Sequence, residues 1–102
     1  MNKVLFAEKA VGALASKSSF TRRGRLDVLY EILLFCRKPQ HKTQIMFSCN
    51  LSYELLKKYL DFLVSNNLLR VFEDEESKRY YQTTDHGKRF ISEYESIKRV
   101  LG

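Results

Sequence analysis

The residues best suited to chemistry are polar side chains gathered in one short stretch in the middle of the chain. Within two helical turns they combine two hydroxyl groups and two ammonium groups, which can bond to phosphate oxygens or to base edges. Their spacing favours contact with nucleic acid. The alternative is that the tyrosine is partly buried and the lysines are ordinary surface charge. These candidates are Ser52, Tyr53, Lys57 and Lys58.

The same sequence offers little to an enzyme. Neither His41 nor His86 has a cysteine or carboxylate at the spacing of metal ligands. The chain has no glycine-rich phosphate loop, no serine at a nucleophile elbow and no isolated pair of carboxylates. We therefore expect no enzymatic activity, no metal, no cofactor and no small-molecule effector.

Composition bounds the class of protein. The chain has 102 residues, of which 44% are hydrophobic, so it can build one small core. Its net charge of +6 favours an anionic partner, most commonly nucleic acid, although many small proteins carry such charge for solubility. No apolar run has the length of a membrane span, and charges interrupt the N-terminal stretch where a signal peptide is apolar. We expect a cytoplasmic, nucleoid-associated protein.

The two cysteines do not form a redox or zinc motif. Cys36 and Cys49 are thirteen residues apart, and no second pair accompanies them. We expect two buried free thiols rather than a disulfide.

A helix is predicted over Arg22–Cys36, apolar around most of its circumference and therefore central to the core. Its N-terminal end is crowded by cations, which the helix dipole disfavours. A bound phosphate would offset that misfit, and a solvated basic end is the alternative. The cations are Arg22, Arg23 and Arg25, and the apolar residues are Leu26, Val28, Leu29, Ile32, Leu33 and Phe35.

Two further helices follow in the arrangement of a helix-turn-helix. Thr43 is predicted to cap a short helix, Gln44–Ser48, whose first amides suit a phosphate. That helix should bury Ile45 and Met46, with Phe47 as a further candidate. After a turn in which Asn50 would supply the left-handed residue, Ser52 caps the longer helix Ser52–Asn66. A short helix, a tight turn and a longer helix are typical of this DNA-binding motif.

The longer helix is predicted to be amphipathic. Residues at spacings of three and four form its apolar stripe, and Asn66 and Asn67 end it because asparagine tolerates the left-handed conformation. The stripe consists of Leu55, Leu56, Tyr59, Leu60, Leu63 and Val64, and the free side carries Glu54, Lys57, Lys58, Asp61 and Ser65. Glu54 and Asp61 should keep binding from being indiscriminate.

A two-stranded hairpin, or wing, is predicted next. Leu69–Phe72 and Arg79–Thr83 are rich in aromatic and β-branched residues, and a polar run separates them. The tip of the wing, Glu73–Glu76, would be repelled by phosphate, which leaves only Lys78 and Arg79 at its base to contact DNA. The tip should therefore point away from the duplex or contact a protein.

Thr84 is predicted to cap a last helix, Asp85–Leu101. Gly87, Phe90, Tyr94, Ile97 and Leu101 repeat at the spacing of a two-heptad seam, with Ile91 and Val100 beside it. The seam favours a homodimer, whose interface would contain Phe90, Ile91, Tyr94, Ile97 and Leu101. The alternative is a helix that packs only on its own domain.

The first 21 residues read as a helical extension or as a loosely ordered tail. Val4, Ala7, Val11 and Leu14 also have seam spacing, which suggests that they lengthen the dimer interface.

With these phrases in place, the chain resembles a family of small archaeal winged-helix DNA-binding proteins of chromatin or regulatory type. The resemblance covers about residues 22–101. It rests on Lys42-Thr43-Gln44-Ile45-Met46, on Asn50 to Leu60, on Leu63 and Leu68, and on Thr84-Asp85-His86-Gly87. It implies double-stranded DNA binding and a homodimer joined through the C-terminal helices as an antiparallel coiled coil. Here the last helix is short and the N-terminus is about twenty residues longer.

The expected fold is α+β and mainly helical: a winged helix-turn-helix with a two-stranded wing and a C-terminal dimerisation helix. Its parts are an N-terminal extension (1–21), the winged domain (22–84) and the dimerisation helix (85–102). The expected function is that of a homodimeric transcriptional regulator or chromatin-architectural protein that binds double-stranded DNA. The alternative is a winged-helix protein-interaction module in a transcription or replication assembly.

Overall fold

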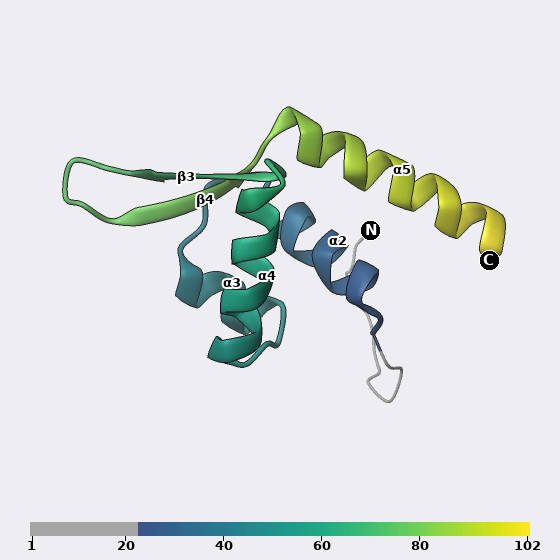
Figure 1. Cartoon of the computed structure of the whole chain (residues 1–102), viewed down its shortest axis with the longest axis horizontal. Helices are drawn as coiled ribbons and strands as arrows, with labels where there is room; N and C mark the ends of the chain where they lie inside the picture. The colour runs from purple at the N-terminus through teal and green to yellow at the C-terminus, as the bar shows by residue number, and fades with distance from the viewer. Residues whose placement is uncertain (1–22) are drawn as a thin grey trace.

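The computed structural model describes residues 23–102. Arg22 and the predicted extension 1–21 lie outside the described residues. The elements are α2 (Arg25–Phe35), α3 (Lys42–Ser48), α4 (Tyr53–Ser65), β3 (Leu69–Glu73), β4 (Arg79–Thr83) and α5 (Asp85–Leu101). The hairpin projects from one side of the helices and α5 runs out on the other side (Figure 1). This order confirms the predicted winged helix-turn-helix.

Helix α2 forms the centre of the core, as predicted, but it begins later than its sequence pattern suggests. Gly24 is the N-cap, and its amide donates to a carboxylate oxygen of Asp27 at 2.9 Å. The face that carries Val28, Leu29, Ile32 and Leu33 is buried. Leu26, predicted to lie in the core, is exposed because the neighbouring elements cover only that face.

Helices α3 and α4 and the turn between them match the predicted motif. Asn50 has a φ of 55° and Asn67 a φ of 62°, so asparagines supply the left-handed positions before and after α4. The buried face of α4 is narrower than predicted. Leu56, Leu60 and Leu63 are buried. The predicted stripe residues Leu55 and Val64 are exposed, and so is Phe47 on α3, because no described element packs against those flanks.

The cap of α3 differs from the prediction. His41, not Thr43, is the N-cap, and the His41 amide donates to Gln44 Oε1 at 2.9 Å. The helix therefore starts at Lys42 and places Thr43 inside its first turn, where the side chain is exposed. Gln44, three residues after this cap, is the sequence signal of a capping box and could have indicated the start of the helix.

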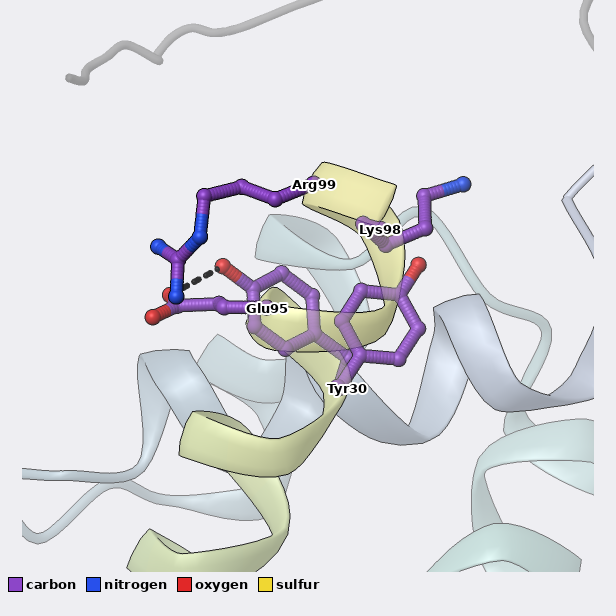
Figure 2. A pocket seen from close by; sticks show the side chains of 5 residues that line it. Tyr30, Glu95, Lys98 and Arg99 are labelled. Carbon is purple, nitrogen blue, oxygen red and sulfur yellow. Dashed lines mark hydrogen bonds between the residues drawn. The ribbon is translucent and has the colours of Figure 1, made fainter. Parts of the chain in front are cut away.

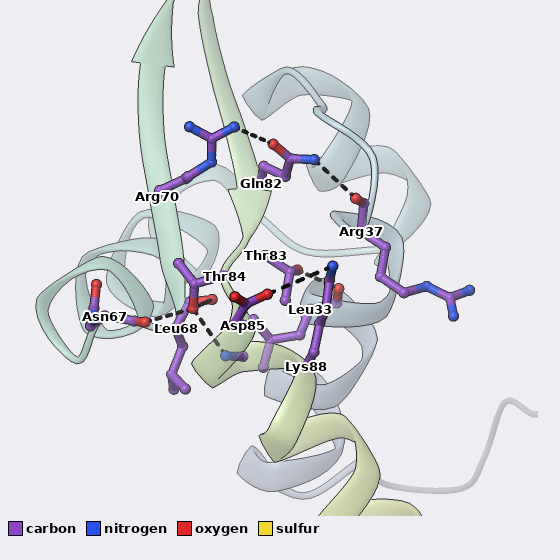
Figure 3. Close-up of polar contacts among 11 residues, drawn as sticks. Leu33, Arg37, Asn67, Leu68, Arg70, Gln82, Thr83, Thr84, Asp85 and Lys88 are labelled. Atoms are coloured by element: carbon purple, nitrogen blue, oxygen red, sulfur yellow. Dashed lines mark hydrogen bonds and ion pairs between the residues drawn. The ribbon is translucent and has the colours of Figure 1, made fainter.

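The wing is an antiparallel hairpin whose register pairs Leu69 with Thr83 and Glu73 with Arg79. Its root is tied to α2, because Thr83 Oγ1 donates to the Leu33 carbonyl at 2.6 Å (Figure 3). A bridge between Gln40 and Tyr81 adds the segment before α3 to the edge of β4. The hairpin is thus fixed to the helices at its root and free at its tip.

Helix α5 begins at the root of the wing. The Thr84 hydroxyl donates to the Asn67 carbonyl at 2.7 Å and accepts from the Gly87 amide at 3.0 Å, as the predicted cap requires (Figure 3). A Cβ at Gly87 would lie 2.3 Å from the Leu68 carbonyl oxygen. Gly87, predicted as the first residue of the dimer seam, therefore serves a close approach within its own chain.

Cys36 and Cys49 are buried and free, as predicted. Burial raises the pKa of Cys36 to about 12, so its thiolate is scarce at neutral pH. Among residues 23–102, no helix is both long and apolar enough to cross a membrane.

Candidate nucleic-acid interface

The turn between α3 and α4 is held by Arg23. The guanidinium donates through Nη1 to the Cys49 carbonyl at 2.8 Å and through Nη2 to the Asn50 carbonyl at 3.2 Å. Nη1 also pairs with Glu31 Oε1 at 2.5 Å. Burial raises the pKa of Glu31, and the charge of Arg23 acts in the opposite direction. Arg23 was predicted to contact DNA, but three contacts hold its side chain within the protein. There it fixes the residues that lead into α4.

The other two arginines of that cluster have different placements. Arg25, the first residue of α2, is exposed, and Arg22 lies outside the described residues. Of the two described arginines, Arg23 is held by its partners, and Arg25 has no such contact among the described residues.

The first two turns of α4 present the predicted polar residues. Ser52 Oγ accepts from the Leu55 amide at 3.2 Å, which leaves its hydroxyl proton free to donate. Tyr53 is 55% exposed, and Lys57 and Lys58 are exposed on the same helix. The structure therefore brings all four predicted residues to the surface at one end of α4.

A residue that the sequence reasoning overlooked completes this end. The ammonium group of Lys42, the first residue of α3, lies 5.4 Å from the centre of the Tyr53 ring. That distance is typical of a cation–π contact and joins the starts of α3 and α4 into one basic and aromatic surface. The sequence did not indicate this contact, because the cap predicted at Thr43 placed Lys42 outside the helix. Gln44 is less available than predicted, because its side-chain oxygen caps α3.

The outer face of the wing is a ladder of stacked side chains. Arg70 lies 4.6 Å over the Phe72 ring, Phe72 stacks on Tyr80 at 5.7 Å, and Tyr80 meets His41 at 4.4 Å. Arg70 also donates to the Gln82 side chain at 2.6 Å (Figure 3). The ladder joins the wing to the start of α3.

The acidic wing tip is partly explained by the turn it forms. One carboxylate oxygen of Asp74 accepts from the amides of Glu76 at 2.8 Å and Lys78 at 2.9 Å, and these bonds lower the pKa of Asp74. Glu73 pairs with Arg79 at 3.5 Å. Both predicted DNA contacts at the base of the wing, Lys78 and Arg79, are exposed, and Arg79 also has an acidic partner on the neighbouring strand.

The middle of α5 is fastened to α2 by stacked tyrosines. The rings of Tyr30 and Tyr94 are 4.2 Å apart, and the Tyr30 hydroxyl donates to Glu95 at 2.8 Å (Figure 2). The Tyr94 hydroxyl donates to Asp27, which also pairs with Lys98 at 3.8 Å. Burial and the adjacent carboxylates raise the pKa of both tyrosines. An open hollow of about 470 Å³ lies beside the stack.

The predicted dimer interface divides along this helix. Ile91 is only 7% exposed and belongs to the core of its own domain, so it is not free to meet a second chain. Phe90 and Tyr94 are half-buried, whereas Ile97 and Leu101 are exposed. The apolar surface that remains open is at the C-terminal end, where Val100 adds to it.

Within the part of the chain that the structure describes, no three histidine, cysteine or carboxylate side chains come together as metal ligands would.

Comparison with known proteins gives one family and a set of similar folds. A family model described as winged helix-turn-helix matches residues 22–102. The uncharacterized protein MJ0287 of Methanocaldococcus jannaschii is 30% identical over 81 residues, which are 78% of this chain and 78% of that protein. MJ0290 of the same organism is 25% identical over 81 residues, but they cover only 36% of its length. Both relatives are archaeal, as the resemblance implies.

Several solved structures share the fold. Sso10a-2, a DNA-binding protein from Sulfolobus solfataricus, superposes with a TM-score of 0.70 at 24% identity over 78% of this chain and 82% of that one. The transcriptional regulator BldR from Sulfolobus solfataricus gives a TM-score of 0.66 at 17% identity over 72% of this chain and 55% of that one. At these identities the likeness concerns the fold alone.

Proposed function

We propose, from the premise that this chain belongs to the winged helix-turn-helix family, that it binds double-stranded DNA with α4 in the major groove. The observation that carries the proposal is the exposed start of α4, which follows a turn that Arg23 fixes: Tyr53 lies beside Lys42, and Lys57 is exposed one turn further along. In this motif the first residues of the second helix reach base edges. The fold is shared with proteins described as DNA-binding and as a transcriptional regulator.

The contacts divide by chemistry. Ser52, Tyr53, Lys57 and Lys58 would meet bases or the nearby backbone, with Lys42 added to that group. Phosphate contacts would come from exposed groups around this surface. These are Arg25, Thr43 and Lys78, together with Arg22, whose placement is not described. Arg23, Gln44 and Arg79 have partners within the chain, so we propose that their main role is to hold the surface in shape.

We further propose that the protein acts as a homodimer through the end of α5. Ile97 and Leu101 are exposed at seam spacing, with Phe90 and Tyr94 half-buried behind them. Two symmetry-related copies of α4 would then read half-sites one or more helical turns apart. Such a dimer would regulate transcription or organise DNA in the nucleoid.

A gel-shift titration of the full chain at two salt concentrations tests DNA binding. Affinity should fall steeply with salt, because each phosphate contact releases counterions. The variant Lys57→Ala/Lys58→Ala should reduce the salt slope by up to about two. The matched control is Lys88→Ala on α5, which removes one exposed charge far from α4 in sequence and should change the slope little. Absence of any shift at low salt would reject the proposal.

Sedimentation tests the dimer. Ile97→Ser/Leu101→Ser should turn a dimer into a monomer with an intact fold, whereas Ser92→Ala on the same helix should not. Removal of residues 1–18 shows whether the extension adds to the interface, as its seam spacing suggests: an unchanged dimer would exclude that role. A wild-type chain that sediments as a monomer at all concentrations would refute the dimer itself.

A protein-interaction module is the second candidate, and the acidic wing tip favours it. Phosphate would repel this tip, so a basic protein surface is the better partner for it. Glu75→Gln/Glu76→Gln removes charge but keeps Asp74, which builds the turn. A large gain in DNA affinity would place the tip near phosphate. An unchanged affinity would agree with a tip directed away from the duplex and open to a protein.

A further inference from the structure

The exposed face of α4 carries large apolar side chains, which attraction to phosphate does not require. Leu55 and Phe62 are 47% and 49% exposed. They are seven residues apart, so they lie on one flank of the helix about two turns from each other. The four charged residues of α4, namely Glu54, Lys57, Lys58 and Asp61, cancel in net charge. Attraction to phosphate must therefore come mainly from groups outside α4.

The fold does not explain this flank. The core that α4 completes uses Leu56, Leu60 and Leu63. Leu55 and Phe62 lie outside that cluster, and Tyr59 between them is the only member of the flank that packs against it among the described residues. Two large apolar side chains left open on one flank, beside Lys58, are available to a partner.

Only one group in the major groove of DNA suits such side chains. The C5 methyl group of thymine is the apolar group that the groove exposes, and the other base edges present hydrogen-bond donors and acceptors. Seven residues of helix rise about 10 Å, which is about three base-pair steps of 3.4 Å. The two side chains are therefore spaced to meet methyl groups about three base pairs apart.

We propose that Leu55 and Phe62 contact thymine methyl groups, so that the preferred duplex carries thymines about three base pairs apart in each half-site. This inference rests on the proposed DNA binding and adds to it the class of sequence that is read. Glu54 and Asp61 on the neighbouring face are repelled by phosphate and so weaken binding to DNA of any sequence. Preference for one DNA sequence must then come from contacts with base edges.

The test compares duplexes that differ only in this methyl group. The full chain is titrated with an alternating A–T duplex and with the same duplex containing uracil in place of thymine, at one salt concentration. Burying one methyl group is worth about fourfold in affinity, so two contacts give roughly 15-fold weaker binding to the uracil duplex. An alternating G–C duplex should gain affinity when its cytosines carry a 5-methyl group, since this group occupies the same position in the groove.

The variants assign the effect to the two side chains. Leu55→Ala/Phe62→Ala should bind the thymine and uracil duplexes equally, with an unchanged thermal unfolding midpoint. Leu26→Ala is the matched control, because Leu26 is also exposed but lies on α2. Equal wild-type affinity for thymine and uracil duplexes would overturn the inference but leave DNA binding in place. Discrimination that survives in the double variant would also overturn it, and absence of all DNA binding would reject both proposals.

Discussion

Helices α4 and α5 have similar sequence patterns but differ in how much of their length is buried. Each begins at a hydroxyl cap, Ser52 or Thr84, and each carries apolar residues at helical spacing. One face of helix α4 is buried along most of the helix, through three leucines. Helix α5 is buried only in its first half, through Gly87 and Ile91, and its end is exposed.

The difference shows that helical period alone does not tell which apolar residues are buried. In α4 the stripe is wider than the surface available to cover it, so Leu55 stays outside. In α5 the stripe is longer than α2, which it packs against through Tyr94 and Lys98. Exposed apolar surface thus lies on the flank of α4 and at the end of α5.

The largest expected effect separates the two faces of α4. Leu56→Ala should lower the free energy of unfolding by about 2–5 kcal/mol, because it opens a cavity in the core. Leu55→Ala, one residue away, should change it by less than about 0.5 kcal/mol. Urea denaturation measures both. Similar losses for the two variants would mean that the flank is covered in the folded protein.

A smaller effect concerns the start of α5. In an exposed helix interior, Gly→Ala stabilises by about 1 kcal/mol. At Gly87 we expect the opposite sign, a loss of about 1–3 kcal/mol, because the new Cβ would lie 2.3 Å from the Leu68 carbonyl oxygen. Thermal denaturation of Gly87→Ala beside Ser92→Ala, an exposed site on the same helix, gives the comparison. A stabilised Gly87→Ala would contradict the close approach.

The smallest expected effect concerns the middle of α5. Tyr94→Phe keeps the ring that stacks on Tyr30 but removes the hydroxyl that donates to Asp27. We expect a loss of about 1 kcal/mol in the free energy of unfolding, as for one hydrogen bond. Tyr53→Phe, where the ring is exposed, should cost almost nothing. Urea denaturation checks both, and equal costs would show that the Asp27 contact adds no stability.

Much of the fold followed from local sequence signals. The cap at Thr84, both strands and the left-handed Asn50 lie where turn and capping preferences place them. These signals act within a few residues, so a sequence shows them directly. The cap of α3 was missed, although Gln44 three residues after His41 carried a signal that could have found it.

The candidate site was only partly predictable. The surface of Ser52, Tyr53, Lys57 and Lys58 could be read from spacing because it belongs to one helix. The contact of Lys42 with Tyr53 and the bonds of Arg23 to the Asn50 carbonyl join residues distant in sequence. From its type and position, Arg23 was predicted to be free to contact DNA. Only the tertiary structure shows that its guanidinium already has partners within the protein.

By itself, the sequence determined the order of elements, their caps and turns, and the positions of polar residues on each helix. These depend on backbone preferences and periodicity, which are local. Tertiary structure decided which apolar residues remain exposed, which charges have partners and how close α5 comes to the wing. Those outcomes depend on the limited area that neighbouring elements can cover and on distances across the fold. Leu55 and Leu56, adjacent in sequence, are therefore exposed and buried respectively.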